Sequence, residues 1–166
     1  MALIFISAIS GTGKTTLMHE LRKRDEEAYD TDDECIRVSK VTNKVLSYEE
    51  AKKDGYNWIY PKGALLKLKD LSTTKNVFLL GSTDNSEELK DAADEYIWMR
   101  IPLDVLVQRL DSRTKEYGKS ERERKLILDL YKSASKTLDP KTFTLDATKP
   151  VKTIADVLLA HVRQLQ

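Results

Sequence analysis

The amino-acid sequence predicts an α/β fold in which helices cover both faces of a parallel sheet, giving a three-layer α/β/α sandwich. Four short apolar runs lack polar alternation, which is typical of strands that are buried on both faces. They are Ala2–Ser7, Asn76–Leu80, Tyr96–Ile101 and Phe143–Leu145. Segments with helical spacing separate these runs, and strands that alternate with helices form parallel sheets with right-handed crossovers.

The first helix is expected over Lys14–Arg24, where apolar residues recur at helical spacing from Leu17 onward. The last is expected over Val151–Leu165, which has one apolar stripe and a proline suited to its first turn. The helices between them are expected over Pro61–Asp70, Ser86–Ala93, Leu103–Asp111 and Glu121–Lys136. A short fifth strand, Glu27–Tyr29, is inferred from the acidic segment that follows it. Ligands of such sheets bind at the carboxyl ends of the strands.

The segment Ala8–Thr16 joins the first strand to the first helix and has the sequence Ala-Ile-Ser-Gly-Thr-Gly-Lys-Thr-Thr. This is the context of a phosphate-binding P-loop, with Ala8 at a position where the backbone need only turn. Loop N–H groups and the helix N-terminus would cradle a polyphosphate, Lys14 would reach its terminal phosphates, and the Thr15 hydroxyl would bind Mg²⁺. The predicted nucleotide-binding residues of the loop are Ile9, Ser10, Gly11, Thr12, Gly13, Lys14, Thr15 and Thr16. We therefore expect this chain to bind a nucleoside triphosphate.

Composition limits the partners of the protein. Within 166 residues, 28 basic and 27 acidic side chains nearly balance, so no general field favours nucleic acid. The single cysteine, Cys35, excludes an internal disulfide and fits a reducing compartment. The first apolar run has no basic leader and is too short to span a bilayer. We expect a single cytoplasmic domain with no membrane partner, and composition leaves the oligomeric state open.

An acidic pair follows the second expected strand, in the segment Tyr29–Asp33. Asp30 and Asp32 alternate, so both side chains would lie on one side of the loop. One can then hold Mg²⁺ while the other orients a substrate hydroxyl. An acidic cap for a helix that starts near Asp33 is the alternative interpretation.

The third strand ends at Gly81, where hydrolytic ATPases place an acidic residue for metal and water. Its absence disfavours a hydrolytic machine or a switch GTPase. Gly81 is expected to let a substrate approach the backbone closely. Ser82, Thr83 and Asn85 offer hydrogen bonds to a substrate or, equally well, caps for the next helix.

Arg109 and Arg113 lie one helical turn apart and precede a basic hairpin, so a lid is expected over about residues 112–120. Arginines on such an arm can fold over a transferring phosphoryl group and exclude water. A surface loop with ordinary charge pairs is the alternative. Between the second and third strands, the segment Gly55–Tyr60 is rich in aromatic residues that could stack on a ring or enter the core, whereas Trp98 is expected in the core.

In this order, the P-loop, the Asp-x-Asp strand end, the strand ending in glycine and the paired arginines resemble those of the small P-loop kinases. That group contains adenylate and other nucleoside monophosphate kinases, shikimate kinase and gluconate kinase. The resemblance covers nearly the whole chain and implies a five-stranded parallel sheet in the order 2-3-1-4-5. The lid phrase between Arg113 and Lys119 resembles a little-characterised branch described only as AAA-type, ATP-binding or kinase-like proteins.

The resemblance also implies roles for individual residues. The acidic pair is most similar to that of shikimate kinase, which implies that Asp30 serves the metal and Asp32 the acceptor hydroxyl. The segment Leu145–Pro150 is similar to the adenine loop of the family, which implies that Ala147 and Pro150 contact the base. Arg109 matches the lid arginine of the family. An acceptor-binding insert is expected at about residues 36–70, which include Arg37, Lys40, Lys44 and Trp58.

The function implied is an ATP- and Mg²⁺-dependent phosphotransferase that acts on a small molecule, with a nucleoside or nucleotide as the favoured acceptor. Its catalytic residues would be Lys14, Asp32, Arg109 and Arg113. The glycine turn and the arginine that hold the carboxylate of shikimate have no clear counterpart, so the acceptor stays open. A non-catalytic ATP-binding regulatory module and a kinase of a non-nucleotide hydroxyl acceptor or an RNA end are the alternatives.

Overall fold

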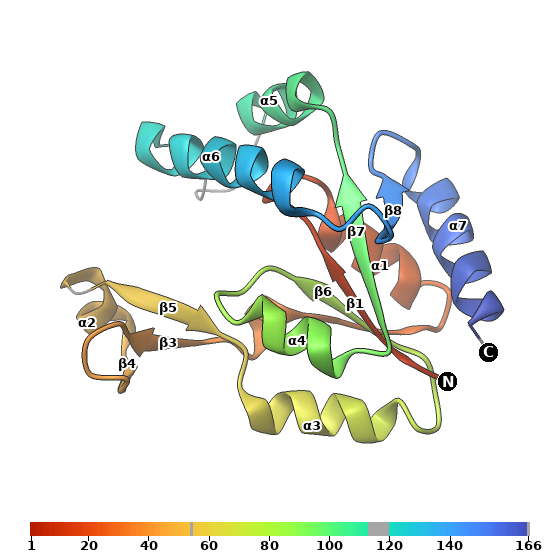
Figure 1. Ribbon diagram of the computed structural model, residues 1–166, viewed down its shortest axis with the longest axis horizontal. Helices are drawn as coiled ribbons and strands as arrows, with labels where there is room; N and C mark the ends of the chain where they lie inside the picture. The colour runs from red at the N-terminus through yellow and green to blue at the C-terminus, as the bar shows by residue number, and fades with distance from the viewer. Residues whose placement is uncertain (54, 113–119, 166) are drawn as a thin grey trace.

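A computed structural model describes residues 1–53, 55–112 and 120–165, apart from the side chains of residues 53 and 135 (Figure 1). Within these residues the larger sheet is parallel and has the strand order β2-β6-β1-β7-β8. Its strands are β1 (Leu3–Ser7), β2 (Glu27–Asp30), β6 (Val77–Gly81), β7 (Glu95–Arg100) and β8 (Phe143–Asp146). Counted along the chain within this sheet, the order is 2-3-1-4-5, as the resemblance implies. Each expected strand is present, with its ends within a residue of those expected.

Helices cover both faces of this sheet, which confirms the three-layer fold. One apolar core includes residues of α1 (Lys14–Arg22), α5 (Leu103–Asp111), α6 (Glu121–Thr137) and α7 (Val151–Gln164). The other includes residues of α3 (Lys62–Leu71) and α4 (Ser86–Ala92). Along β1, Ile4 and Ile6 belong to the first core, and Leu3 and Phe5 belong to the second. Because both faces are covered, the strand needs no polar alternation.

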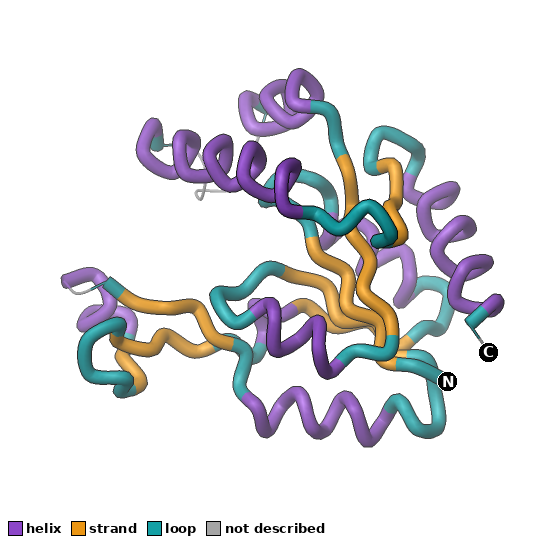
Figure 2. Tube along the Cα trace, in the orientation of Figure 1, coloured by secondary structure: helices purple, strands orange, loops and turns teal. Residues whose placement is uncertain are grey.

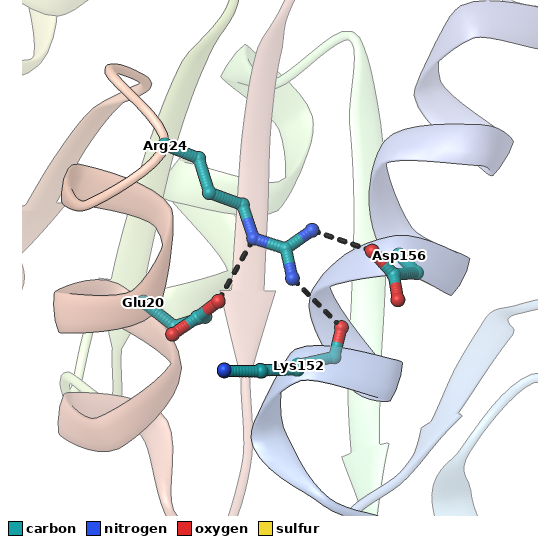
Figure 3. A network of polar contacts seen from close by, with 4 residues as sticks. All are labelled: Glu20, Arg24, Lys152 and Asp156. Carbon is teal, nitrogen blue, oxygen red and sulfur yellow. Dashed lines mark hydrogen bonds and ion pairs between the residues drawn. The ribbon is translucent and has the colours of Figure 1, made fainter.

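An arginine just beyond α1 ties that helix to α7 (Figure 3). Arg24 Nη1 donates to Asp156 Oδ1 at 2.6 Å, and its Nη2 donates to the Lys152 carbonyl at 3.0 Å. Its Nε donates to Glu20 Oε1 at 2.9 Å. Since α1 begins at the P-loop, these contacts help to hold the helix that follows the loop.

The strand register brings three loops to one edge of the sheet. Ser7, the last residue of β1, pairs with Gly81 on β6 and with Trp98 on β7, and Asp30 of β2 pairs with Leu80. Parallel strands end at the same edge, where ligands of such sheets bind. The P-loop after β1, the acidic segment after β2 and the loop after β6 therefore meet there.

A second, antiparallel sheet was not expected from the sequence. It has the order β4-β3-β5, with β3 (Ile36–Ser39), β4 (Val45–Leu46) and β5 (Tyr56–Ile59), and α2 (Tyr48–Lys53) lies between β4 and β5 along the chain. A single 3₁₀ turn, η1 (Thr31–Asp33), leads toward it from β2. Figure 2 shows this smaller sheet projecting beyond the larger one. It falls in the segment 36–70, where an insert is expected.

Among the described residues, no helix is both long enough and apolar enough to cross a membrane.

Candidate active site

The loop between β1 and α1 turns at two glycines with positive φ. Gly11 has φ of 93° and Gly13 has φ of 110°, a region that L side chains rarely adopt. Between them, the N–H and the hydroxyl of Thr12 both donate to the Ile9 carbonyl, at 3.2 and 2.7 Å. Within the described residues, no side chain caps α1. Its first N–H groups are therefore suited to an anionic ligand, as expected of a P-loop.

Lys14, the first residue of α1, bends back over this loop. Its Nζ donates to the Ala8 carbonyl at 2.7 Å and lies 3.4 Å from the Ile9 carbonyl. The ammonium therefore lies over the loop that would hold the phosphates. Thr15 follows it in the first turn of α1, half-buried, and Thr16 is exposed.

Asp30 ends β2 as a half-buried carboxyl near Lys14. Burial raises the pKa of the Asp30 carboxyl, and the charges of Asp32 and Asp33 act in the same direction. The Asp32 N–H, which donates to Asp30 Oδ1 at 3.1 Å, and the Lys14 ammonium partly oppose this shift in pKa. That hydrogen bond caps η1, so Asp30 does act as a cap, although for a single turn that starts at Thr31.

The oxygen donors present fit Mg²⁺. The Asp30 carboxylate and the Thr15 hydroxyl are hard ligands of the type that this ion takes. A carboxyl whose ionised form is disfavoured by burial and by neighbouring acids is stabilised in that form by a cation. In the described part of the chain, no three His, Cys, Asp or Glu side chains gather to hold a metal by themselves. Magnesium bound here would take its other ligands from phosphates and water, as is usual in phosphoryl-transfer sites.

Asp32 lies exposed on η1, and its carboxylate contacts the smaller sheet. Its Oδ1 accepts a hydrogen bond of 2.9 Å from Nε1 of Trp58, which lies on β5. The sequence suggested ring stacking or a core position for Trp58 and did not suggest this bond. No local sequence pattern could predict this hydrogen bond, because the two residues meet only once β5 has formed.

An arginine surrounded by aromatic rings lies on the same face of the smaller sheet. Arg37 pairs with Trp58 in the β3–β5 register, and its guanidinium carbon lies 4.9 Å from the centroid of the Trp58 ring. It also lies 5.2 Å from the ring of Tyr48 and 5.9 Å from that of Tyr56, within the range of cation–π attraction. Tyr60, by contrast, is buried in the core beside α3 and α4.

Gly81 does not leave room for a substrate, so that expectation is wrong. A Cβ atom at this position would lie 1.7 Å from Thr31 Oγ1 and 2.5 Å from Thr31 Cβ. Gly81 and Thr31 are both buried. Glycine is needed here because the Thr31 side chain packs directly on the backbone of β6.

The polar residues after Gly81 connect parts of the protein. Ser82 Oγ donates to the Ala8 carbonyl at 2.7 Å, which links this loop to the P-loop. Asn85 binds the backbone of Tyr60 through both side-chain atoms, at 3.0 and 3.1 Å. The Thr83 N–H donates to Ser86 Oγ at 3.1 Å, and Asn85 is the N-cap residue of α4 but makes no side-chain capping bond.

Arg109 of α5 joins the two loops expected to contact ATP. Its Nη1 donates to the Thr12 carbonyl, and its Nη2 donates to the Ala147 carbonyl, both at 2.7 Å. Ala147 is buried just beyond β8, and Pro150 is exposed before α7. The P-loop, Arg109 and the predicted adenine loop therefore lie together. Arg113 and the predicted lid residues 113–119 lie outside the described residues.

Two further residues bear on the site. Burial raises the pKa of the half-buried Cys35 thiol to about 12, and nearby carboxylates add to the effect, so Cys35 stays a thiol at neutral pH.

Trp98 is only half-buried, although a core position was expected. It lines a cavity of about 280 Å³ beside the P-loop, together with Ile9, Thr12 and Tyr131.

Comparisons with known proteins agree with this fold. The model of a family described as "AAA domain" matches residues 4–129. A gluconokinase from Sinorhizobium meliloti 1021 is 15% identical, with a TM-score of 0.59, 98% of this chain covered and 91% of that chain. A shikimate kinase from Bacteroides thetaiotaomicron is 16% identical, with a TM-score of 0.63 and coverage of 97% and 98%. A deoxyadenosine kinase from M. mycoides is 15% identical, with a TM-score of 0.50 and coverage of 98% and 100%.

At these identities the likeness establishes a shared fold, which is that of the small P-loop kinases. A search of the curated proteins gives no match.

Proposed function

This chain belongs to the AAA domain family, and we propose that it is an Mg²⁺-dependent kinase that transfers a phosphoryl group from ATP to a hydroxyl of a small molecule. A nucleoside or nucleotide is the favoured acceptor. The observation that carries the proposal is the meeting of three groups at one sheet edge: the P-loop with Lys14, the Asp30–Asp32 segment, and Arg109. The names of the three structural neighbours, all kinases of small molecules, support the same reaction class.

In this proposal the P-loop binds the phosphates of ATP. Residues 9–16 surround the phosphates, the N–H groups at the start of α1 donate to phosphate oxygens, and Lys14 exchanges its bonds to loop carbonyls for bonds to the terminal phosphates. Thr15 and Asp30 would hold Mg²⁺, which neutralises charge on the phosphate oxygens when bound. Arg109 keeps the P-loop and the loop at Ala147 together, so that the phosphate and base subsites have a fixed spacing.

Asp32 acts on the acceptor in this proposal. Its carboxylate orients the acceptor hydroxyl and takes the proton as the oxygen attacks the γ-phosphorus. Arg113, outside the described residues, is proposed to stabilise the charge that develops on the transferred group. Ala147 and Pro150 are proposed to contact the base. The smaller sheet is proposed to form the acceptor-binding insert of a single kinase domain.

The test is ADP formation from Mg-ATP with deoxyadenosine, AMP, gluconate and shikimate as separate acceptors. Lys14→Ala should abolish transfer without unfolding the protein, because this half-buried lysine belongs to neither apolar core. Lys23→Ala, at an exposed position after α1, is the matched control and should keep full activity.

The alternatives give different results in the same assay. Tight ATP binding with no transfer to any acceptor would favour a regulatory ATP-binding module. Salt-sensitive binding of RNA, together with transfer to its ends, would favour an RNA kinase. Full transfer activity in Lys14→Ala would contradict the proposed mechanism itself.

A further inference from the structure

Trp58 is held by its backbone at the carboxyl edge of the larger sheet. Its N–H donates to Asp84 Oδ2 at 2.6 Å, and its carbonyl accepts from the Asp84 N–H at 2.8 Å. Asp84 lies in the loop that follows β6. This pair of hydrogen bonds therefore sets the position of β5 relative to the loops where the candidate site lies.

The ring of Trp58 is held as well. Arg37 lies opposite it in the β3–β5 register, with its guanidinium carbon 4.9 Å from the ring centroid. A cation–π contact of this kind attracts the guanidinium to the face of the ring. Tyr48 and Tyr56 flank the same guanidinium. The indole is thus restrained at its backbone and at its face.

The remaining edge of the ring meets Asp32. Indole Nε1–H is a donor only, and it donates to Asp32 Oδ1 at 2.9 Å. Asp32 is exposed on a single 3₁₀ turn, where a carboxylate without such a bond rotates freely in solvent. The backbone and the ring face of Trp58 are both held, so its indole N–H favours one orientation of the Asp32 carboxylate. The second carboxylate oxygen is left for another partner.

We propose that Trp58 is a positioning residue for phosphoryl transfer: its indole N–H fixes the Asp32 carboxylate so that the other carboxylate oxygen faces the acceptor hydroxyl. This inference rests on the proposed function. In the step, the acceptor oxygen forms a bond to the γ-phosphorus, and the bond from that phosphorus to the bridging oxygen breaks. Its electron pair leaves on ADP, and the proton of the acceptor passes to Asp32.

The first test compares Trp58→Phe with Tyr56→Phe, using whichever of deoxyadenosine, AMP, gluconate and shikimate gives the highest turnover. Trp58→Phe removes the N–H donor and keeps an aromatic ring for Arg37, whereas Tyr56→Phe removes a hydroxyl from another ring of the same cluster. Because a misplaced reacting group can cost about 100-fold in rate, we expect Trp58→Phe to lower kcat by roughly 10- to 100-fold. The KM for ATP should stay unchanged, and Tyr56→Phe should lower kcat far less than Trp58→Phe, because it leaves the hydrogen bond between Trp58 and Asp32 intact.

The second test separates positioning from a merely structural role. In an Asp32→Asn background the carboxylate base is already absent, so adding Trp58→Phe should lower kcat no further. Trp58→His keeps a ring N–H, so in the wild-type background it should lower kcat less than Trp58→Phe does. If circular dichroism shows that Trp58→Phe does not fold, Trp58→His replaces it in the comparison with and without Asp32→Asn.

The outcomes distinguish this inference from the proposed function. If wild type transfers phosphate and Lys14→Ala does not, the function stands. An unchanged kcat in Trp58→Phe, or an equal loss with and without Asp32, would then overturn the positioning role alone. If wild type phosphorylates no acceptor, both proposals fall together.

Discussion

Replacing Gly81 with alanine tests how the acidic segment is held against the sheet. A Cβ atom at residue 81 would lie 1.7 Å from Thr31 Oγ1 and 2.5 Å from both Thr31 Cβ and Thr31 Cγ2. The backbones of residues 81 and 31 cannot move apart easily. Gly81 pairs with Ser7 of β1, and Thr31 directly follows Asp30, which pairs with Leu80 of β6.

The size of the effect follows from this crowding. Overpacking a buried site typically costs about 1–3 kcal/mol. For a chain of this length, each kcal/mol lowers Tm by roughly 2–4 °C, so Gly81→Ala should lower Tm by roughly 2–12 °C. Since Thr31 lies between Asp30 and Asp32, the folded fraction of the variant should also lose activity.

Thermal unfolding of Gly81→Ala, Thr31→Gly and the double variant provides the assay. Thr31→Gly removes the three atoms nearest to the new methyl group, so the double variant should be about as stable as Thr31→Gly alone. Such coupling is expected only between residues in contact. If the two losses simply add in the double variant, Thr31 is not what occupies the space at Gly81 and the reasoning is refuted.

Two further predictions concern Asp30 and Arg109. Burial raises the pKa of Asp30 in the folded state, so the folded protein binds this proton more tightly than the unfolded chain, and stability falls as the pH rises through the titration range of this carboxyl. Asp30→Asn keeps an oxygen for the Asp32 N–H, so it should have a higher Tm than wild type at pH 7. This advantage should shrink at lower pH and on addition of Mg-ATP, and a difference independent of pH would contradict the argument. In Arg109→Lys, the lysine ammonium lacks the planar guanidinium that donates to the Thr12 and Ala147 carbonyls at the same time. Loss of one charge-assisted hydrogen bond, worth about 1.5 kcal/mol or more, should weaken ATP binding by about tenfold or more in calorimetry, and an unchanged Kd would show that the bridge does not support nucleotide binding.

Local patterns in the sequence were enough to predict the larger sheet and the P-loop. The residues of β1 and β6 are apolar in unbroken runs, and this is a local consequence of being covered on both faces. Gly11 and Gly13 take positive φ within a loop whose spacing alone predicts a phosphate cradle. The smaller sheet escaped prediction because β3, β4 and β5 are short and only partly buried, which leaves no clear period.

Thus the sequence by itself identified the residues of the P-loop. Through its resemblance to a known family, it also predicted the strand order of the parallel sheet. The tertiary structure alone decided which side chains meet at the edge of the sheet. Thr31 fills the space at Gly81, Trp58 binds Asp32, and Arg109 joins Thr12 to Ala147. Each of these contacts links residues far apart in the chain. Their distances depend on how strands, turns and helices are placed in space, a relation that no local pattern of residues contains.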